Sequence, residues 1–266
     1  MTPILVSPTQ AVPNMTPDYE VRLLLNPTAV FSPEFELKDT VLSAFNMAPT
    51  ITKINVQFLD TGFKEIYAAG WSARIRKTEN EDEFELTYKK RYAIMGGDID
   101  AALTTANTDG FGDSDSKYKA QIEWGYQNQT LSISRKKTVA DPEKSGTDLP
   151  DKSNSCKMLI NESPEKFDNW SHKKWGTSTL AMSRIFGPVL VRRSVGTWNG
   201  IPLYLEVWPL LNHEGTGVEY IVEASFKTKN RSTASVEQSN LVTYLQSKDW
   251  FLGQDSIKTQ LIMERY

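Results

Sequence analysis

Residues 71–92 read WSARIRKTENEDEFELTYKKRY, and they carry the clearest structural pattern in the chain. Polar and apolar residues alternate on both sides of the polar segment 78–82, and a period of two is typical of a half-buried β-strand. The pattern therefore predicts a hairpin with strands over 71–77 and 83–92.

One face of this hairpin is basic. Side chains two positions apart share a face, so Arg74 and Arg76 lie together on the first strand. Thr87, Lys89 and Arg91 lie together on the second. Such a face is either turned to solvent, as most strand charges are, or lines a polar lumen that holds a polyanion. In a lumen, long cations would surround phosphate oxygens while carboxylates hold a divalent metal.

Further strand patterns occur on both sides of the hairpin. They cover 18–25, 51–59, 117–124, 129–136, 187–194, 201–208 and 217–227. We take the total as about eight strands, mostly joined as hairpins, with helices before, between and after them. This arrangement is α+β, and the number of strands permits closure into a barrel.

The remaining segments suggest one domain with helices around the strands. Helices are expected over 32–45, 63–69, 98–106, 235–246 and 255–266, with another starting near 163. Residues 1–17 are rich in Pro and Thr and are expected to form a flexible leader before a single domain over 18–266. The polar stretch 138–155 predicts a surface loop, which we interpret as an insertion within that domain.

Composition excludes several classes of function. The chain has 266 residues, 39% hydrophobic and 24% charged, and a net charge of −3, which disfavours non-specific nucleic-acid binding. The single cysteine, Cys156, excludes an intrachain disulfide and a thiolate zinc cluster. His172 and His213 leave little material for a histidine-rich metal site. No apolar run approaches the roughly 20 residues of a membrane span, so we expect a cytoplasmic protein without membrane contact; its oligomeric state is open.

The order of the charged segments resembles the CYTH, or triphosphate tunnel metalloenzyme, superfamily. That family opens with a Glu-x-Glu-x-Lys strand, and DYEVR at 18–22 occupies this place. A "D-T" step, an Arg-x-Arg strand and a Thr-Leu-Lys-like strand follow in the family. Here FLDT at 58–61, RIR at 74–76 and LTYK at 86–89 appear in that order.

The resemblance implies an eight-stranded antiparallel β-barrel tunnel with flanking helices. It also implies Mg²⁺ or Mn²⁺ as cofactor, and hydrolysis or transfer at a triphosphate or other phosphorylated small molecule. Phosphoryl transfer needs mainly positioning and charge neutralisation, so Arg and Lys clamps with carboxylate-held metals suffice for it. The expected partner is a small phosphate ester or a polyphosphate.

Residue roles follow from the same resemblance. The implied metal ligands are Asp18, Glu20, Glu206 and Glu223. The implied phosphate ligands are Arg22, Arg74, Arg76, Lys89, Arg91 and Arg193. Glu20 and Lys89 are the catalytic candidates. Arg192 and Arg193 point to opposite faces of their strand, so one of them lies in the lumen, while Lys119 and Arg135 are weaker additions.

The late carboxylate pair departs from the family pattern. Ile221 and Ser225 stand two residues on either side of Glu223, where a Glu-x-Glu pair would need a second acid. An incomplete set predicts a weak second metal site. The alternative hypothesis is therefore a repurposed tunnel that binds or converts another small molecule, for example in specialised metabolism, without triphosphate hydrolysis. Tyr204 and Trp208 share the strand face of Glu206, so they are luminal if it is.

Overall fold

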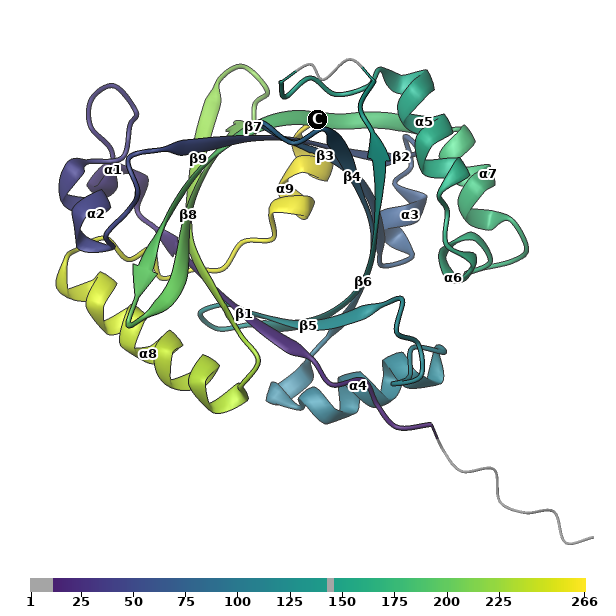
Figure 1. Cartoon of the computed structure of the whole chain (residues 1–266), viewed down its shortest axis with the longest axis horizontal. Helices are drawn as coiled ribbons and strands as arrows, with labels where there is room; N and C mark the ends of the chain where they lie inside the picture. Colours follow the sequence, from purple (N-terminus) through teal and green to yellow (C-terminus); the bar gives the residue numbers. More distant parts are fainter. Residues whose placement is uncertain (1–11, 143–145) are drawn as a thin grey trace, which may run out of the picture.

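The computed structural model describes residues 12–142 and 146–266, and in this part of the chain nine strands close into a barrel (Figure 1). The strands are β1 (Asp18–Leu25), β2 (Ile51–Asp60), β3 (Trp71–Thr78), β4 (Glu83–Ala93), β5 (Lys119–Trp124), β6 (Gln129–Ala140), β7 (Arg184–Trp198), β8 (Ile201–Leu211) and β9 (Val218–Thr228). Around the barrel they follow the order β1-β5-β6-β4-β3-β2-β7-β8-β9. The predicted hairpin is confirmed, since β3 pairs with β4 in antiparallel register.

The expected α+β barrel is confirmed, but the expected eight antiparallel strands are not. All nine segments with a strand pattern are strands, so the tally of eight was one too low. Strand β1 runs antiparallel to β9 and parallel to β5. An odd number of strands cannot alternate in direction all the way around a closed ring. One parallel pair is therefore required, and it lies between β1 and β5.

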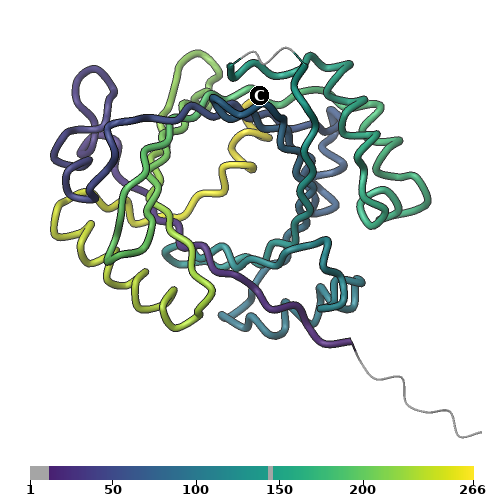
Figure 2. The backbone as a smooth tube through the Cα atoms, in the orientation of Figure 1, coloured from purple at the N-terminus to yellow at the C-terminus, as the bar shows by residue number. Residues whose placement is uncertain are grey.

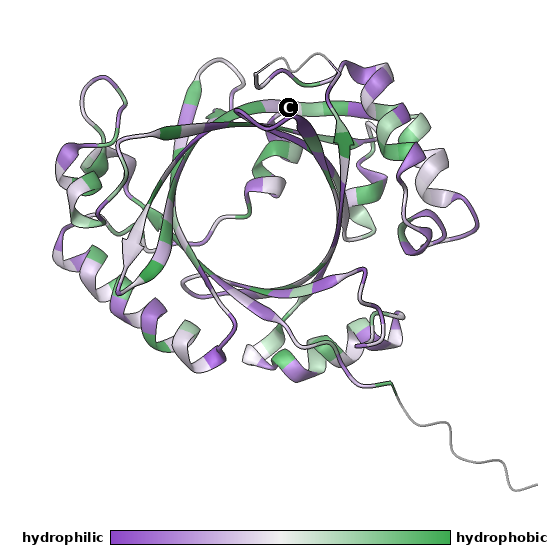
Figure 3. Cartoon of the chain, in the orientation of Figure 1, coloured by the Kyte–Doolittle hydropathy of each residue, from purple (hydrophilic) through white to green (hydrophobic). Residues whose placement is uncertain are grey.

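Each strand turns one face to the lumen and one to a covering layer. On β1, Val21 and Leu23 are buried on the outer side, while Glu20 and Arg22 project into the barrel. Hydrophilic and hydrophobic residues accordingly alternate along the strands in Figure 3. The main core thus lies between the outside of the barrel and its helices. The lumen is largely polar, apart from an apolar cluster in which Ile54, Val56 and Phe58 of β2 group with Ile262 and Met263 of α9 (Lys258–Arg265).

The helices surround the barrel with one exception, α9, which lies within the outline of the ring (Figures 1 and 2). Their bounds are α1 (Pro27–Val30), α2 (Asp39–Ala44), α3 (Glu65–Ala68), α4 (Ile99–Thr108), α5 (Lys152–Asn161), α6 (Glu165–Asp168), α7 (Trp175–Ala181), α8 (Arg231–Ser247) and α9 (Lys258–Arg265). None of the helices in the described ranges is both long and apolar enough to span a membrane.

Two expected segments differ in the structure. The helix predicted over 32–45 begins only at α2, because the backbone first makes a tight turn in which Phe35 has a φ of 59° and Phe31 bridges to Leu37. The two ends of the loop predicted over 138–155 belong to regular elements, and its residues 143–145 lie outside the described residues. Strand β6 continues to Ala140 by pairing with β4, and α5 starts at Lys152.

The beginning of the chain is described only from residue 12. Residues 1–11 of the expected leader lie outside the described residues. Residues 12–17 pack against neighbouring segments: Asn14 forms a β-bridge with Gly112, and Met15 is buried in the core. Packing against the rest of the domain therefore begins before β1 within the described residues.

Candidate functional site

The barrel encloses a cavity of about 290 Å³ to which every strand and the start of α9 contribute side chains. Nine lining residues are cationic: Arg22, Arg74, Arg76, Lys89, Arg91, Lys136, Arg193, Lys227 and Lys258. Four are carboxylates: Glu20, Glu123, Glu206 and Glu223. The lining is therefore strongly positive, although the chain as a whole is negative.

One side of the cavity is lined by Arg74, Arg76 and Lys136, and these three cations together with Glu85, to which all three bind, are called the basic wall. Glu85 accepts hydrogen bonds from Arg74 Nη2 at 3.0 Å, Arg76 Nη2 at 2.8 Å and Lys136 Nζ at 2.8 Å. Burial opposes its charge, but the two arginines prevail and lower the pKa of Glu85 to about 2. Burial and the neighbouring Arg76 lower the pKa of Arg74 to about 10. Three cations thus share one carboxylate, and positive charge is crowded here.

A second cluster surrounds Glu123 on β5. This buried carboxylate binds Lys89 Nζ at 2.6 Å and Arg22 Nη2 at 2.9 Å, with Arg91 Nε at 3.6 Å. Burial lowers the pKa of Lys89 to about 8, because removal from water disfavours the ammonium more than Glu123 favours it. Lys89 therefore holds its proton less firmly than an exposed lysine does.

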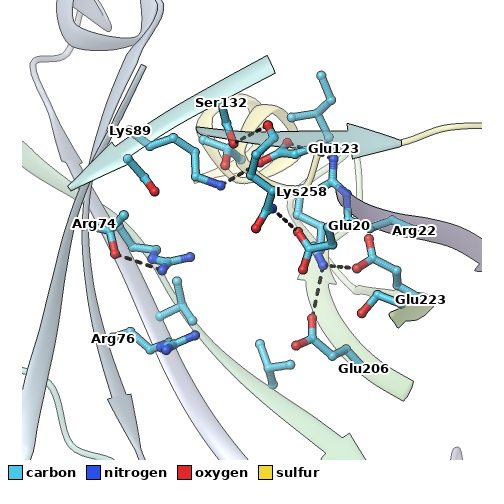
Figure 4. Close-up of a pocket in the computed structure, with 18 of the residues that line it drawn as sticks. Glu20, Arg22, Arg74, Arg76, Lys89, Glu123, Ser132, Glu206, Glu223 and Lys258 are labelled. Atoms are coloured by element: carbon cyan, nitrogen blue, oxygen red, sulfur yellow. Dashed lines mark hydrogen bonds and ion pairs between the residues drawn. The ribbon is translucent and has the colours of Figure 1, made fainter. Parts of the chain in front are cut away.

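The opposite side, which we call the carboxylate wall, includes Glu206, Glu223 and Lys258 (Figure 4), together with Arg193, which binds Glu206. Glu206 and Glu223 face each other directly on β8 and β9. Lys258 Nζ bridges them, at 3.1 Å from Glu206 Oε2 and 2.6 Å from Glu223 Oε1. Arg193 binds Glu206 Oε1 through Nε at 2.9 Å and Nη2 at 2.5 Å. Two cations therefore balance two carboxylates.

Glu20 stands apart from these clusters. Its Oε2 accepts a hydrogen bond from Gln121 Nε2 at 2.6 Å, and its Oε1 lies 3.4 Å from Lys227 Nζ. Burial raises the pKa of Glu20, but Lys227 and Arg22 outweigh this, so the pKa is lowered overall. Glu20 is thus a charged carboxylate in the lumen.

Four of the lining arginines hold a donor that lacks an acceptor. In the described part of the chain, the Nε–H groups of Arg22, Arg74, Arg76 and Arg91 are buried and form no hydrogen bond. Buried polar groups in proteins are nearly always paired, with protein, water or a bound ligand. The cavity therefore offers more donors than its own residues satisfy.

The same architecture occurs in a solved structure. A putative adenylyl cyclase from Hippeastrum, described as having a dominant triphosphatase activity, superposes with a TM-score of 0.55 at 14% identity, over 93% of this chain and 99% of that one. A putative adenylate cyclase from Bacillus halodurans gives a TM-score of 0.49 at 11% identity, over 94% of this chain and 98% of that one. No protein-family model and no curated protein sequence matches.

This chain therefore shares the fold of the Hippeastrum protein. The resemblance read from the charged motifs is therefore confirmed at the level of the fold. The two arginines of the RIR motif and Lys89 of the LTYK motif line the tunnel, so the luminal interpretation of the basic face is right and the solvent-facing one is wrong. The motifs mark the strands whose inner faces build the basic lining.

Most of the candidate residues line the tunnel. They are Glu20, Arg22, Arg74, Arg76, Lys89, Arg91, Arg193, Glu206 and Glu223, and Tyr204 and Trp208 join them as expected. Asp18 does not, because it is the exposed first residue of β1, beyond the rim of the cavity. Arg192 points outward and binds Glu36 and the Phe35 carbonyl oxygen, so Arg193 is the luminal one.

The two weaker additions lie outside the tunnel. Lys119 is exposed, and Arg135 is placed over the ring of Tyr118 on the outer side of β6. Conversely, sequence reasoning assigned no role to Glu85, Glu123, Lys136 or Lys258. Glu85 shares the face of Lys89 by period two, so that pattern could have found it. Lys258 lies on a helix, where no strand pattern points to it.

The tunnel residues do not fit a divalent metal held by the protein alone. Within residues 12–142 and 146–266, no three Asp, Glu, His or Cys side chains form a metal-binding group. The two late carboxylates that the family pattern assigns to a metal already bind Lys258, and one also binds Arg193. Entry of Mg²⁺ or Mn²⁺ together with a phosphate ligand stays a prediction.

Proposed function

We propose that the tunnel binds a small phosphorylated molecule, a polyphosphate or a compact organic phosphate ester, with its phosphate groups at the basic wall. The unpaired Nε–H groups of Arg74 and Arg76 carry this proposal, because phosphate oxygens are the acceptors that a guanidinium binds best. The nine lining cations against four carboxylates support it.

The size of the cavity favours a small ligand. At about 290 Å³ it lies near the lower end of the roughly 300–1,000 Å³ typical of ligand pockets. Its lining is largely polar and charged, with an apolar strip from Ile54, Val56 and Phe58 on β2. A ligand with much charge and little apolar surface suits such walls.

Hydrolysis or transfer of a phosphoryl group is the second candidate. The Hippeastrum protein of the same fold is described as a triphosphatase, which makes this the activity to test. Glu20 and Lys89 remain the catalytic candidates in this proposal. Lys89, whose pKa is lowered to about 8, can donate a proton near neutral pH. Glu20, a charged carboxylate in the same cavity, can accept one.

Binding is tested first, by calorimetric titration of the whole protein with tripolyphosphate and with sulfate, in EDTA. Saturable binding that disappears in Arg74→Ala/Arg76→Ala and persists in Arg192→Ala supports the proposal, since Arg192 is an arginine outside the tunnel. If the folded protein binds neither tripolyphosphate nor sulfate, the proposal is contradicted.

Turnover is tested separately. Phosphate release is measured from tripolyphosphate, nucleoside triphosphates and thiamine triphosphate, with Mg²⁺, with Mn²⁺ and with EDTA. Metal-dependent release that is lost in Glu20→Gln supports the hydrolase and the expected cofactor. Tight binding without release supports the repurposed tunnel.

A further inference from the structure

The start of α9 brings a lysine into the part of the tunnel where two acidic side chains meet. Lys258 and Thr259, the first two residues of α9, line the cavity together with Ile257 just before the helix, and none of the three belongs to the barrel wall. Lys258 Nζ lies between the carboxylates of Glu206 and Glu223 and contacts both, as the dashed lines in Figure 4 indicate. A single ammonium thus joins β8, β9 and α9.

The hydrogen-bonding capacity of Glu206 is used up. Its Oε1 accepts two hydrogen bonds from Arg193, and its Oε2 accepts one from Trp208 Nε1 at 2.9 Å and one from Lys258 Nζ at 3.1 Å. An ionised carboxylate has about four lone-pair sites, so four donors fill them. A metal ion could coordinate Glu206 only by displacing one of these donors.

The Lys258 ammonium also lies against the aromatic ring of Trp208. Lys258 Nζ lies 4.6 Å from the centre of the Trp208 ring, a distance at which a cation is attracted to an aromatic face. The Lys258 side chain is only 14% exposed, and those of Glu206 and Glu223 are 8% and 3% exposed. Partly dehydrated charges interact more strongly than exposed ones, so the three groups hold one another firmly.

Contacts on both sides of Lys258 fix the helix in this place. Upstream, Asp255 accepts backbone hydrogen bonds from residues 126, 127 and 128 in the turn between β5 and β6. A Cβ atom at Gly125 would lie 2.3 Å from Asp255 Oδ1, so this turn needs glycine there. Downstream, Arg265 binds Glu219 at 2.8 Å, and the Tyr266 hydroxyl accepts from the Leu211 N–H at 3.1 Å. Lys258 is therefore held from both directions.

We infer that the Lys258 ammonium is the resident cation of the Glu206–Glu223 pair and takes the place that the family pattern assigns there to a divalent metal. Two negative charges are neutralised by Lys258 and Arg193, so the carboxylate wall has no net charge left to attract a metal. The inference concerns this wall alone and does not depend on what the basic wall binds.

Manganese titration followed by electron paramagnetic resonance tests the inference, because bound Mn²⁺ loses the sharp signal of the free ion. The titration uses the whole protein without phosphate or other polyanions. Wild-type protein is expected to show no Mn²⁺ site that depends on Glu206. Lys258→Met, which keeps the length of the side chain and removes its charge, is expected to gain one, with binding at least about tenfold tighter.

Two controls define the gained site. Lys258→Met/Glu206→Gln is expected to lose it. Lys137→Met removes a cation outside the tunnel, in the ion pair with Glu162, and is expected to leave Mn²⁺ binding at the wild-type level. If Lys258→Met does not fold, Lys258→Gln replaces it in the same series. Thermal unfolding of each variant shows which are folded.

Two results would overturn the inference. One is a wild-type Mn²⁺ site that disappears in Glu206→Gln, because it would show that metal displaces Lys258. The other is a folded Lys258→Met or Lys258→Gln protein without any gain in Mn²⁺ binding. Neither result bears on tripolyphosphate binding, which is measured in a separate titration, so failure here and failure of the proposed function are distinguishable.

Discussion

The basic wall and the carboxylate wall face the same cavity but differ in the balance of their charges. At the basic wall three cations share the single carboxylate of Glu85, and two buried Nε–H groups have no acceptor. At the carboxylate wall two cations meet two carboxylates, and Glu206 accepts as many hydrogen bonds as it can. The excess of positive charge therefore lies at the basic wall, and this is where the proposed anion would bind.

Removing the excess charge of the basic wall would test the comparison most directly. Arg74→Ala/Arg76→Ala is expected to weaken tripolyphosphate binding by at least about 100-fold, because hydrogen bonds to charged groups contribute about 1.5–3 kcal/mol each. Calorimetric titration measures the effect, with Arg192→Ala expected to stay within about twofold of wild type. Equal losses in both variants would mean that general charge, and not this wall, attracts the anion.

Removing the carboxylate of the basic wall should strengthen anion binding instead of weakening it. Glu85 competes with a ligand for the same guanidinium and ammonium groups, so Glu85→Gln is expected to tighten anion binding by about tenfold. It should also lower the free energy of unfolding by about 1–3 kcal/mol, because the three neighbouring cations would then repel one another without the negative charge of Glu85 between them. Titration and denaturant unfolding measure the two effects. Glu162→Gln, which loses an outer ion pair with Lys137, is the control. Weaker anion binding in Glu85→Gln would contradict the assignment of this wall.

The Glu123 cluster between the walls predicts a pH dependence. Burial lowers the pKa of Lys89 to about 8, so its ammonium, the form that attracts anions, is present below pH 8 and lost above it. Sulfate, whose own charge is constant over this range, should bind at most about eightfold more weakly at pH 9 than at pH 7.5. Lys89→Arg should remove this dependence, since arginine stays charged. A wild-type affinity that is flat across this range would exclude Lys89 from the anion site.

The smallest effect on anion binding is expected for Lys136, at the rim of the tunnel. Lys136 belongs to the basic wall, but its side chain is 55% exposed, and exposed ion pairs contribute only about 0–1 kcal/mol. Lys136→Ala is therefore expected to weaken tripolyphosphate binding by about two- to threefold, with a loss that shrinks as salt is added. A loss as large as that of the double arginine variant would mean that the anion lies at the mouth of the tunnel.

Much of this arrangement follows from local patterns. Period-two alternation located every strand of the barrel, and the same rule placed Arg74, Arg76 and Lys89 on common faces. The rule also stated correctly that only one of Arg192 and Arg193 is luminal. It could not say which, because the choice depends on the register of β7 against β8, where Arg193 meets Glu206.

Other features depended on contacts between distant segments. The turn at Phe35 replaced an expected helix, and its ring stacks on Tyr220 of β9 at 5.2 Å between centroids. Asp18 carries the right chemistry in the right motif, but it falls on the exposed end of β1. A motif specifies the side chains and their alternation, and strand length and stagger set which of them reach the cavity.

The amino-acid sequence by itself determined the strand faces, the basic lining and the resemblance to tunnel proteins, because alternation along a strand is a local property. Only the tertiary structure decided how the charges inside the tunnel are paired. Glu123 is more than 30 residues from Lys89, and Lys258 is 35 residues from Glu223 and 52 from Glu206. Barrel closure and the placement of α9 bring these groups together, and no local pattern records a contact that exists only once the ring is closed.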